Sequence, residues 1–149
     1  MNTYIIGTLN TTTQDLVVGD TVDLGSVYRR FVNRGKCGLT TYDFTSNAIS
    51  LQHSGFYHIT ATIQFTAPVA GDVTFSLAEN GVAITGASVT ETITTATTEI
   101  RSAVIDFYVV VSKGYVSCMP TTLIKNISII NTGVASTVTN VVVNVEKLD

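Results

Sequence analysis

Hydrophobic and polar residues alternate for twelve positions between Phe56 and Ala67, and this is the clearest pattern in the chain. The residues on one side are Tyr57, Ile59, Ala61, Ile63, Phe65 and Ala67, whereas the other side carries mainly Thr, Gln and His. A period of two is typical of a β-strand with one apolar and one polar face. After a break at 67–72, Val73, Phe75 and Leu77 resume the alternation, and Asn80 and Gly81 favour a tight turn between strands.

The rest of the chain consists of short β-permissive segments separated by turn residues. We expect strands or pairs of short strands within 15–32, 39–44, 48–51, 82–89, 99–112, 115–119, 123–131 and 138–145. No segment keeps a 3.6-residue period, so helix content should be near zero. Many short strands with regularly spaced turns predict an antiparallel β-sandwich or barrel.

Apolar residues occur on both sides of the 99–112 segment, where Ile100, Val104 and Tyr108 interleave with a second apolar set. Such strands are usually buried on both faces. We therefore expect one face of this strand to point toward the core and the other toward a neighbouring subunit. The 138–145 segment has the same character.

Composition supports association with other subunits. The chain of 149 residues is long enough for one domain with its own core, yet only 13% of its residues are charged. The mean hydropathy is +0.36, although no apolar run reaches the roughly 18–20 residues of a membrane helix. Burial between identical subunits accounts for the surplus apolar surface.

The charge balance gives no support for nucleic acid as a partner, because the net charge is −3 and the acidic residues are scattered. A small basic cluster of Arg29, Arg30, Arg34 and Lys36 is interpreted as a solvated loop or as inter-subunit ion pairs. The first residues lack the basic start and apolar run of a secretory signal, so we expect synthesis in the cytoplasm.

Candidate chemistry is sparse. His53 and His58 are the only histidines, and neither has the sequence neighbours of a catalytic triad. No Cys, His, Asp and Glu spacing of a metal site occurs, and we expect neither enzyme activity nor a cofactor. Cys37 and Cys118 are too few for a disulfide framework. A single bridge between them is geometrically possible, but synthesis in the cytoplasm disfavours it, and we expect buried free thiols. A glycosidase-type pair of carboxylates is the one enzymatic arrangement that the sequence leaves open.

A family resemblance rests on the central segment. Its matching residues are Gly55, Tyr57, Ile59, Val73, Phe75, Leu77, Asn80 and Gly81. Their order and spacing resemble the central strands of the tumour-necrosis-factor and complement-globular-head family, and the resemblance extends over roughly residues 27–149. It implies a trimeric antiparallel jelly roll. Residues 11–30 are similar to the opening of small phage virion proteins that carry this fold.

Two regions follow from this interpretation. Residues 15–149 would form the jelly roll, and residues 1–14 would form an N-terminal arm. Tyr4, Ile5 and Ile6 would dock the arm onto a capsid, although a disordered or edge-strand terminus is the alternative. We expect the following residues at the trimer interface or in the core: Tyr57, Ile59, Phe65, Phe75, Phe107, Tyr108 and Val142.

The resemblance favours a non-enzymatic virion protein, a homotrimeric head-decoration or head-fibre knob of a tailed phage. Its partners would be two further copies of itself and a major capsid or other virion protein, with no nucleic acid and no membrane. The alternative is a receptor- or carbohydrate-binding knob on a phage tail or bacterial spore, with the loops at 68–72 and 90–98 contacting a host-surface glycan. Those loops carry no aromatic residue, which favours decoration.

Overall fold

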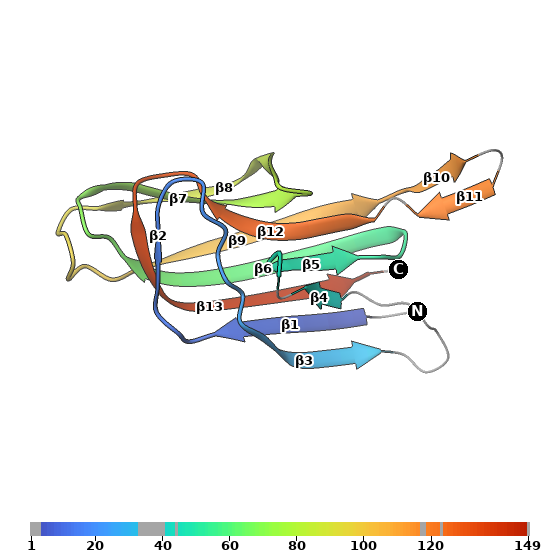
Figure 1. The fold of residues 1–149 in the computed structure, drawn as a ribbon, viewed down its shortest axis with the longest axis horizontal. Coiled ribbons are helices and arrows are strands. Elements are labelled where there is room, and N and C mark those ends of the chain that lie inside the picture. The colour runs from blue at the N-terminus through green and yellow to red at the C-terminus, as the bar shows by residue number, and fades with distance from the viewer. Residues whose placement is uncertain (1–3, 33–40, 44, 117–118, 123, 149) are drawn as a thin grey trace.

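The computed structural model describes residues 4–32, 41–43, 45–116, 119–122 and 124–148, which form two antiparallel sheets and a separate hairpin (Figure 1). The six-stranded sheet has the order β3 (Ser26–Val32), β1 (Tyr4–Asn10), β13 (Ser136–Lys147), β6 (Gly55–Thr66) and β9 (Arg101–Val111), and β2 (Gln14–Leu16) also pairs with β13. The five-stranded sheet has the order β4 (Thr41–Asp43), β5 (Ala48–Leu51), β12 (Lys125–Asn131), β7 (Gly71–Glu79) and β8 (Val82–Ile93). The hairpin consists of β10 (Lys113–Val116) and β11 (Met119–Thr122).

Successive strands pass back and forth between the two sheets. The chain passes from the five-stranded sheet to the six-stranded sheet between β5 and β6, between β8 and β9, and between β12 and β13. This exchange, with antiparallel pairing throughout, is the connectivity of a jelly roll. The predicted all-β antiparallel jelly-roll sandwich is confirmed, and no helix occurs among the described residues.

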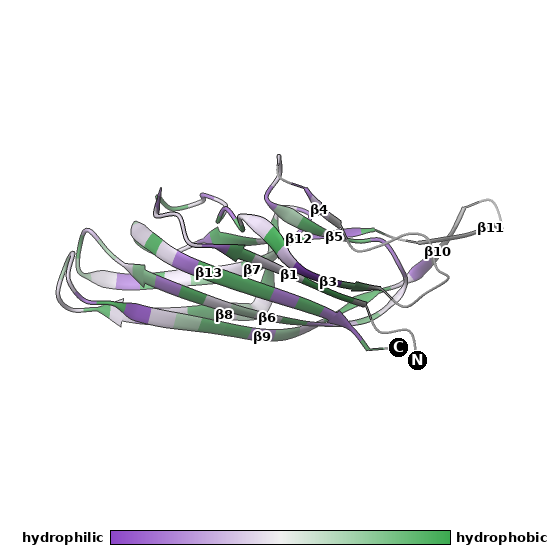
Figure 2. Ribbon diagram, turned by 90° about the horizontal axis from the view of Figure 1, so that it is seen from below, coloured by the Kyte–Doolittle hydropathy of each residue, from purple (hydrophilic) through white to green (hydrophobic). Residues whose placement is uncertain are grey.

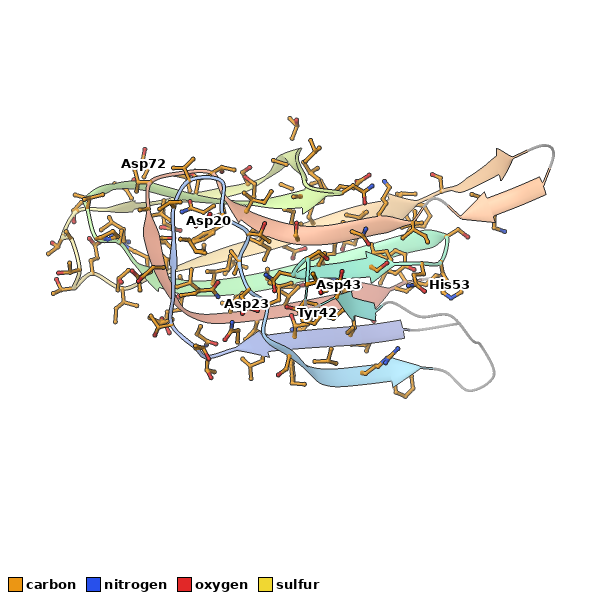
Figure 3. The ribbon with its side chains drawn as sticks, in the orientation of Figure 1. Asp20, Asp23, Tyr42, Asp43, His53 and Asp72 are labelled. Carbon is orange, nitrogen blue, oxygen red and sulfur yellow. The ribbon has the colours of Figure 1, made fainter. Side chains whose placement is uncertain are left out.

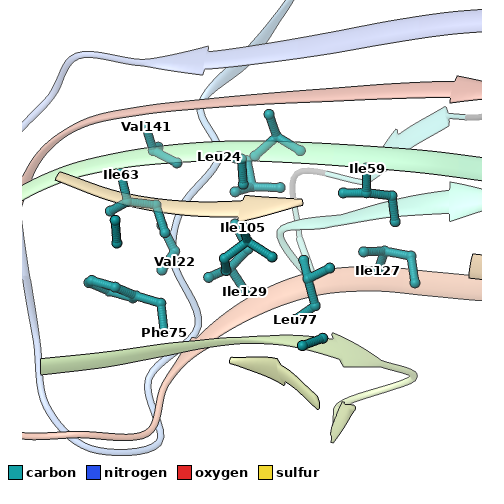
Figure 4. Close-up of a cluster of buried hydrophobic side chains, with 14 of the residues drawn as sticks. Val22, Leu24, Ile59, Ile63, Phe75, Leu77, Ile105, Ile127, Ile129 and Val141 are labelled. Atoms are coloured by element: carbon teal, nitrogen blue, oxygen red, sulfur yellow. The ribbon is translucent and has the colours of Figure 1, made fainter. Parts of the chain in front are cut away.

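The core fills the space between the two sheets (Figure 4). Strand β6 contributes its predicted apolar side, and Val73, Phe75 and Leu77 of β7 meet it from the opposite sheet. The rings of Phe65 and Phe75 pack edge to face with centroids 5.2 Å apart. Aromatic and branched side chains at alternate positions therefore join the two sheets, as the period of two predicts.

The turn between β7 and β8 has the conformation that its residues predict. Asn80 and Gly81 have positive φ angles of 51° and 82°, which Asn and Gly adopt at low cost. Strand β8 runs to Ile93 and is longer than the predicted 82–89 segment, because residues 90–93, which were predicted as the start of a loop, pair with residues 71–74 of β7. Gly86 takes a φ of +87° where the β7–β8 register shifts, which is typical of a bulge.

The structure corrects the predicted N-terminal arm. Residues 4–10 form β1, which lies between β3 and β13 inside the six-stranded sheet rather than at its edge. Ile6 is only 2% exposed, so its side chain belongs to the core and is not available to dock on a capsid. The buried side of this strand carries the polar residues Thr8 and Asn10, so its sequence does not indicate a core element, but both of its edges find backbone partners.

Several residues singled out in the sequence lie outside the described part of the chain: Arg34, Lys36, Cys37 and Cys118. Of the predicted basic cluster, Arg29 and Arg30 lie exposed on β3.

Candidate functional site

The outward side of strands β6 and β9 is the most unusual surface of the molecule. Because the strands pair antiparallel and in register, Phe56 lies opposite Val110, and His58 lies opposite Tyr108. Residues directly opposite each other share one face of a sheet. We call the set Phe56, His58, Val104, Asp106, Tyr108 and Val110 the β6–β9 face.

Large apolar side chains of this face are open to solvent in the single subunit. Phe56 is 53% exposed, Val104 is 55% exposed and Tyr108 is 60% exposed. Figure 2 shows hydrophobic residues distributed along β6, β9 and β13. The opposite side of β9, with Ala103, Ile105 and Val109, is buried in the core. The prediction that β9 carries apolar residues on both faces is therefore confirmed. One face is buried in the core of the subunit, and the other is exposed on the surface of the single subunit.

A hydrogen-bonded pair of polar side chains interrupts the apolar side chains of the β6–β9 face. The His58 Nε2 and Asp106 Oδ1 atoms are 2.6 Å apart, which is hydrogen-bond distance. The His58 ring also stacks on Tyr108, with centroids 4.7 Å apart and an interplanar angle of 16°. The imidazole is therefore held from two sides, and its position on the face is well defined.

The same sheet surface continues across β13 toward β1 and β3. Val142 lies opposite Thr62 of β6 and is half-buried, and Leu9 of β1 lies opposite Val142 on the other side. Farther along, the Tyr28 hydroxyl donates a 2.7 Å hydrogen bond to Asn144 Oδ1. The Tyr28 ring lies over Gly7, where a Cβ would come within 2.7 Å of it, so the glycine makes room for the ring.

The outer surface of the five-stranded sheet is different in kind. Hydroxyl groups pair across β7 and β8, with Thr74 and Thr90 oxygens 2.8 Å apart and Ser76 and Ser88 oxygens 2.7 Å apart. Thr92 donates a further 2.7 Å hydrogen bond to Asp72. The outer side of this sheet therefore carries paired hydroxyls, with Ser88 and Thr90 exposed to water and Ser76 buried, whereas the other sheet presents aromatic and branched side chains.

The residues predicted to lie at the trimer interface or in the core divide between the core of the subunit and the surface of the six-stranded sheet. Tyr57, Ile59, Phe65 and Phe75 lie in the core of the single subunit, where the Tyr57 hydroxyl donates to the His53 carbonyl at 2.8 Å. Phe107 packs partly buried against that core. The residues left at the surface are Tyr108, which is exposed, and Val142, which is half-buried. The exposed Phe56 and Val110 lie in strands whose outward positions alternate with core residues, and that alternation is the signal that could have identified them.

Titratable groups outside this face serve local structure. Burial and the nearby Asp23 carboxylate raise the pKa of Tyr42 to about 12, and the Tyr42 hydroxyl donates to Asn47 at 3.1 Å (Figure 3). Among the residues that the structure describes, no three His, Cys, Asp or Glu side chains gather into a possible metal site. Within that same part of the chain, no helix has the length and apolar character needed to cross a membrane.

Comparisons of the sequence with models of known protein families and with curated proteins find no match. Comparison of the structure with solved structures does find similar proteins. The Eiger TNF from S. frugiperda is similar, with a TM-score of 0.53, 12% identity, and coverage of 99% of this chain and 92% of the other. The globular domain of the zebrafish complement 1qA protein has a TM-score of 0.51 and 10% identity, with 97% and 96% covered.

The fold is a jelly roll of the tumour-necrosis-factor and complement-head type. The vertex protein P5 of PRD1 is also found, with a TM-score of 0.44, 13% identity, and 98% and 97% of the chains covered. The two matches with TM-scores above 0.5 confirm, for the fold, the resemblance inferred from Gly55, Tyr57 and the residues that follow them.

Proposed function

We propose that the chain is a non-enzymatic structural protein that assembles into a homotrimer through the β6–β9 face. The observation that carries this proposal is the exposure of Phe56, Val104, Tyr108 and Val110 together on one sheet face. Contiguous apolar surface of this kind marks an interaction site in soluble proteins. The outer surface of the five-stranded sheet carries paired polar side chains and would stay in contact with water in the trimer.

Closed rotational symmetry explains why such a face needs no other protein. Two further copies around a common axis can cover the face of each subunit, because a ring with threefold rotation closes on itself. Each large apolar side chain contributes about 1.5–3 kcal/mol when it is fully buried. Burial of Phe56, Val104 and Tyr108 would therefore supply a large part of the association free energy.

The His58–Asp106 pair gives this interface its specificity in the proposal. A hydrogen-bonded polar pair inside an apolar contact adds little net affinity but penalises arrangements in which either partner loses its hydrogen bond. The pair is already formed in the single subunit, at 2.6 Å, so assembly need not create it. Subunits would then associate in one register.

Light scattering coupled to size-exclusion chromatography tests the assembly. We expect the mass of three subunits for the wild type and a monomer for Val104→Asp, because the substitution places an unpaired charge in the interface. The matched control is Val82→Asp, since Val82 is 71% exposed at the start of β8 in the other sheet. A wild-type monomer at micromolar concentration would contradict the proposal.

We further propose that the trimer decorates the head, or forms a head-fibre knob, of a tailed phage. The similarity of residues 11–30 to small phage virion proteins supports this role. Attachment through a free N-terminal arm is not part of the proposal, because residues 4–10 belong to the sheet.

The virion role is tested with particles that lack the protein. Purified wild-type trimer, added to such particles, should sediment with them at a fixed number of copies per capsid. The Val104→Asp monomer should bind more weakly, because three linked attachment points raise the effective affinity. Failure of the wild-type trimer to bind would refute decoration and leave the trimer itself unaffected.

A further inference from the structure

A small polar hollow lies on the outer side of the five-stranded sheet, away from the β6–β9 face. Its cavity volume is about 280 Å³, the space of roughly nine waters at liquid density. It lies between the β7–β8 turn, the start of β12, the β4–β5 turn and the loop before β3. The side chains that the argument uses are Thr21, Ser46, Asn80, Asn126 and Ser128.

Small side chains form the floor of this hollow. Ser128 points outward, because its neighbours Ile127 and Ile129 on β12 are core residues. Ala78 lies opposite Ser128 on β7, and Ala48 also lines the cavity. Larger side chains at these positions would fill the space, so the hollow exists because these residues are alanine and serine.

The Ser128 hydroxyl is the strongest sign of a ligand. The residue is only 6% exposed, yet the hydroxyl makes no hydrogen bond to any other residue that the structure describes. Among the described residues, the enclosed side-chain oxygens without a hydrogen-bond partner are those of Thr8 and Asn140. The Ser128 oxygen is not one of them, so it is accessible from the cavity. A hydroxyl that faces the cavity without a partner among the described residues can form a hydrogen bond with a ligand hydroxyl in the hollow.

The rim is held in place by its own hydrogen bonds. Asn80 donates its backbone N–H to the Asn126 carbonyl at 2.8 Å, and the Asn126 N–H donates to Asn80 Oδ1 at 2.9 Å. This reciprocal pair uses the Asn80 side-chain oxygen and leaves its NH₂ group as a donor. Thr21 is fixed by its bridge to Ile130. Pre-organised groups of this kind lower the entropic cost of binding.

The chemistry of the lining selects the class of ligand. Among the lining side chains that the structure describes, none is charged and none is aromatic, so this lining suits neither a phosphate nor a stacked nucleobase. Behind the rim, the Ser46 hydroxyl and the Thr45 amide lower the pKa of Asp43, which is therefore a carboxylate at neutral pH and would repel anions. Hydroxyls and amides remain, and these pair with the hydroxyls of a neutral sugar.

We propose that this hollow binds one ring of an uncharged saccharide, with the Ser128 hydroxyl and the Asn80 amide as its central contacts. The site lies within one subunit and does not depend on the proposed trimer. Because it lies on the sheet opposite the β6–β9 face, it would stay open in that assembly. Weak single sites would then act together on a surface that carries many copies of the sugar.

Nuclear magnetic resonance titration of the full chain tests the site. The probes are glucose, galactose, mannose, N-acetylglucosamine and N-acetylgalactosamine, with glucuronic acid as the charged comparison. We expect saturable shifts from at least one neutral sugar, confined to residues near Thr21, Asn80 and Ser128, and weaker binding of glucuronic acid. Absence of saturation for every neutral sugar, or shifts centred elsewhere, would overturn the proposal.

Substitutions make the same test specific. Ser128→Ala and Thr21→Val should each weaken sugar binding by about three- to tenfold, the effect of one lost hydrogen bond. Thr90→Val is the matched control, because Thr90 lies on the same sheet but bonds to Thr74 away from the hollow. Unchanged binding in the folded Ser128→Ala variant would refute the assignment, whereas loss of trimer formation by Val104→Asp should leave binding per subunit intact.

Discussion

Glu99 shows what one side chain can do at the residue scale. Its carboxylate accepts backbone hydrogen bonds from Thr94 at 2.6 Å and Thr95 at 2.8 Å, and it pairs with Arg101. These bonds, with the Thr95 and Thr94 amides as the largest causes, lower the pKa of Glu99 from 4.5 to about 2. A half-buried acidic residue thus closes the loop between β8 and β9.

A pH dependence follows from this lowered pKa. The contribution of Glu99 to stability is fully present above pH 4.5 and is lost as the pH falls toward about 2, because the unfolded chain takes up the proton first. The protection of the Thr94 and Thr95 amides against hydrogen exchange, relative to the intrinsic exchange rate at each pH, should fall over that range. At neutral pH Glu99→Gln should lose the same protection, and Glu91→Gln should not; equal protection in Glu99→Gln and wild type would contradict the assignment.

Thr8 presents the opposite situation, a side chain whose polar group costs stability. The residue is fully buried, and its hydroxyl has no hydrogen-bond partner among the described residues. Valine has nearly the same shape without the hydroxyl, so Thr8→Val should raise the free energy of unfolding by about 1–2 kcal/mol. Urea unfolding at fixed protein concentration measures this. Thr11→Val, at an exposed position, should change it by less than about 0.5 kcal/mol.

At the scale of elements, side-chain pattern predicted some strands better than others. The alternation in β6 was sufficient, because twelve residues of strict period identify both the strand and its buried side. Strand β1 could not be identified in this way. Its buried side includes Thr8 and Asn10, and the Asn10 side chain donates to the Asp23 carbonyl at 2.9 Å, so polarity hides a core position.

The polar hollow could not be found from sequence for a related reason. Its residues come from four segments, near Thr21, Ser46, Asn80 and Asn126, that only the fold brings together. None of them forms a local motif. The β6–β9 face could be predicted in part. The apolar positions of 99–112 follow from the sequence, but their pairing with Phe56 and His58 depends on the register of two strands that lie far apart in the chain.

Removal of β1 tests its role as a sheet strand. Deletion of residues 1–10 would leave the pairing edges of β3 and β13 open and would remove Ile6 from the core. We expect insoluble protein or loss of cooperative thermal unfolding, because open strand edges promote aggregation. Ile6→Val, which removes one methylene, should cost only about 0.5–1.5 kcal/mol. A soluble, cooperatively folding deletion variant would show that β1 is dispensable.

At the scale of the whole molecule, stability and association are linked if the β6–β9 face is covered by other copies. The melting temperature should then rise with total protein concentration, because the folded state is the one that associates. Val104→Asp should melt at a lower temperature that does not change with concentration. Differential scanning calorimetry over a hundredfold range of concentration distinguishes the two, and a flat wild-type response would contradict obligate assembly.

The pairing of β1 with β13 sets Tyr4 beside Lys147, so the first and last described strands meet at one end of the sandwich (Figure 1). A short peptide could join these neighbouring points, and the chain could be reopened at Asn80–Gly81 to give a circularly permuted protein with the same sheets. Cargo fused to either original end would emerge from one pole of the subunit, which makes the protein a natural scaffold for one-sided display.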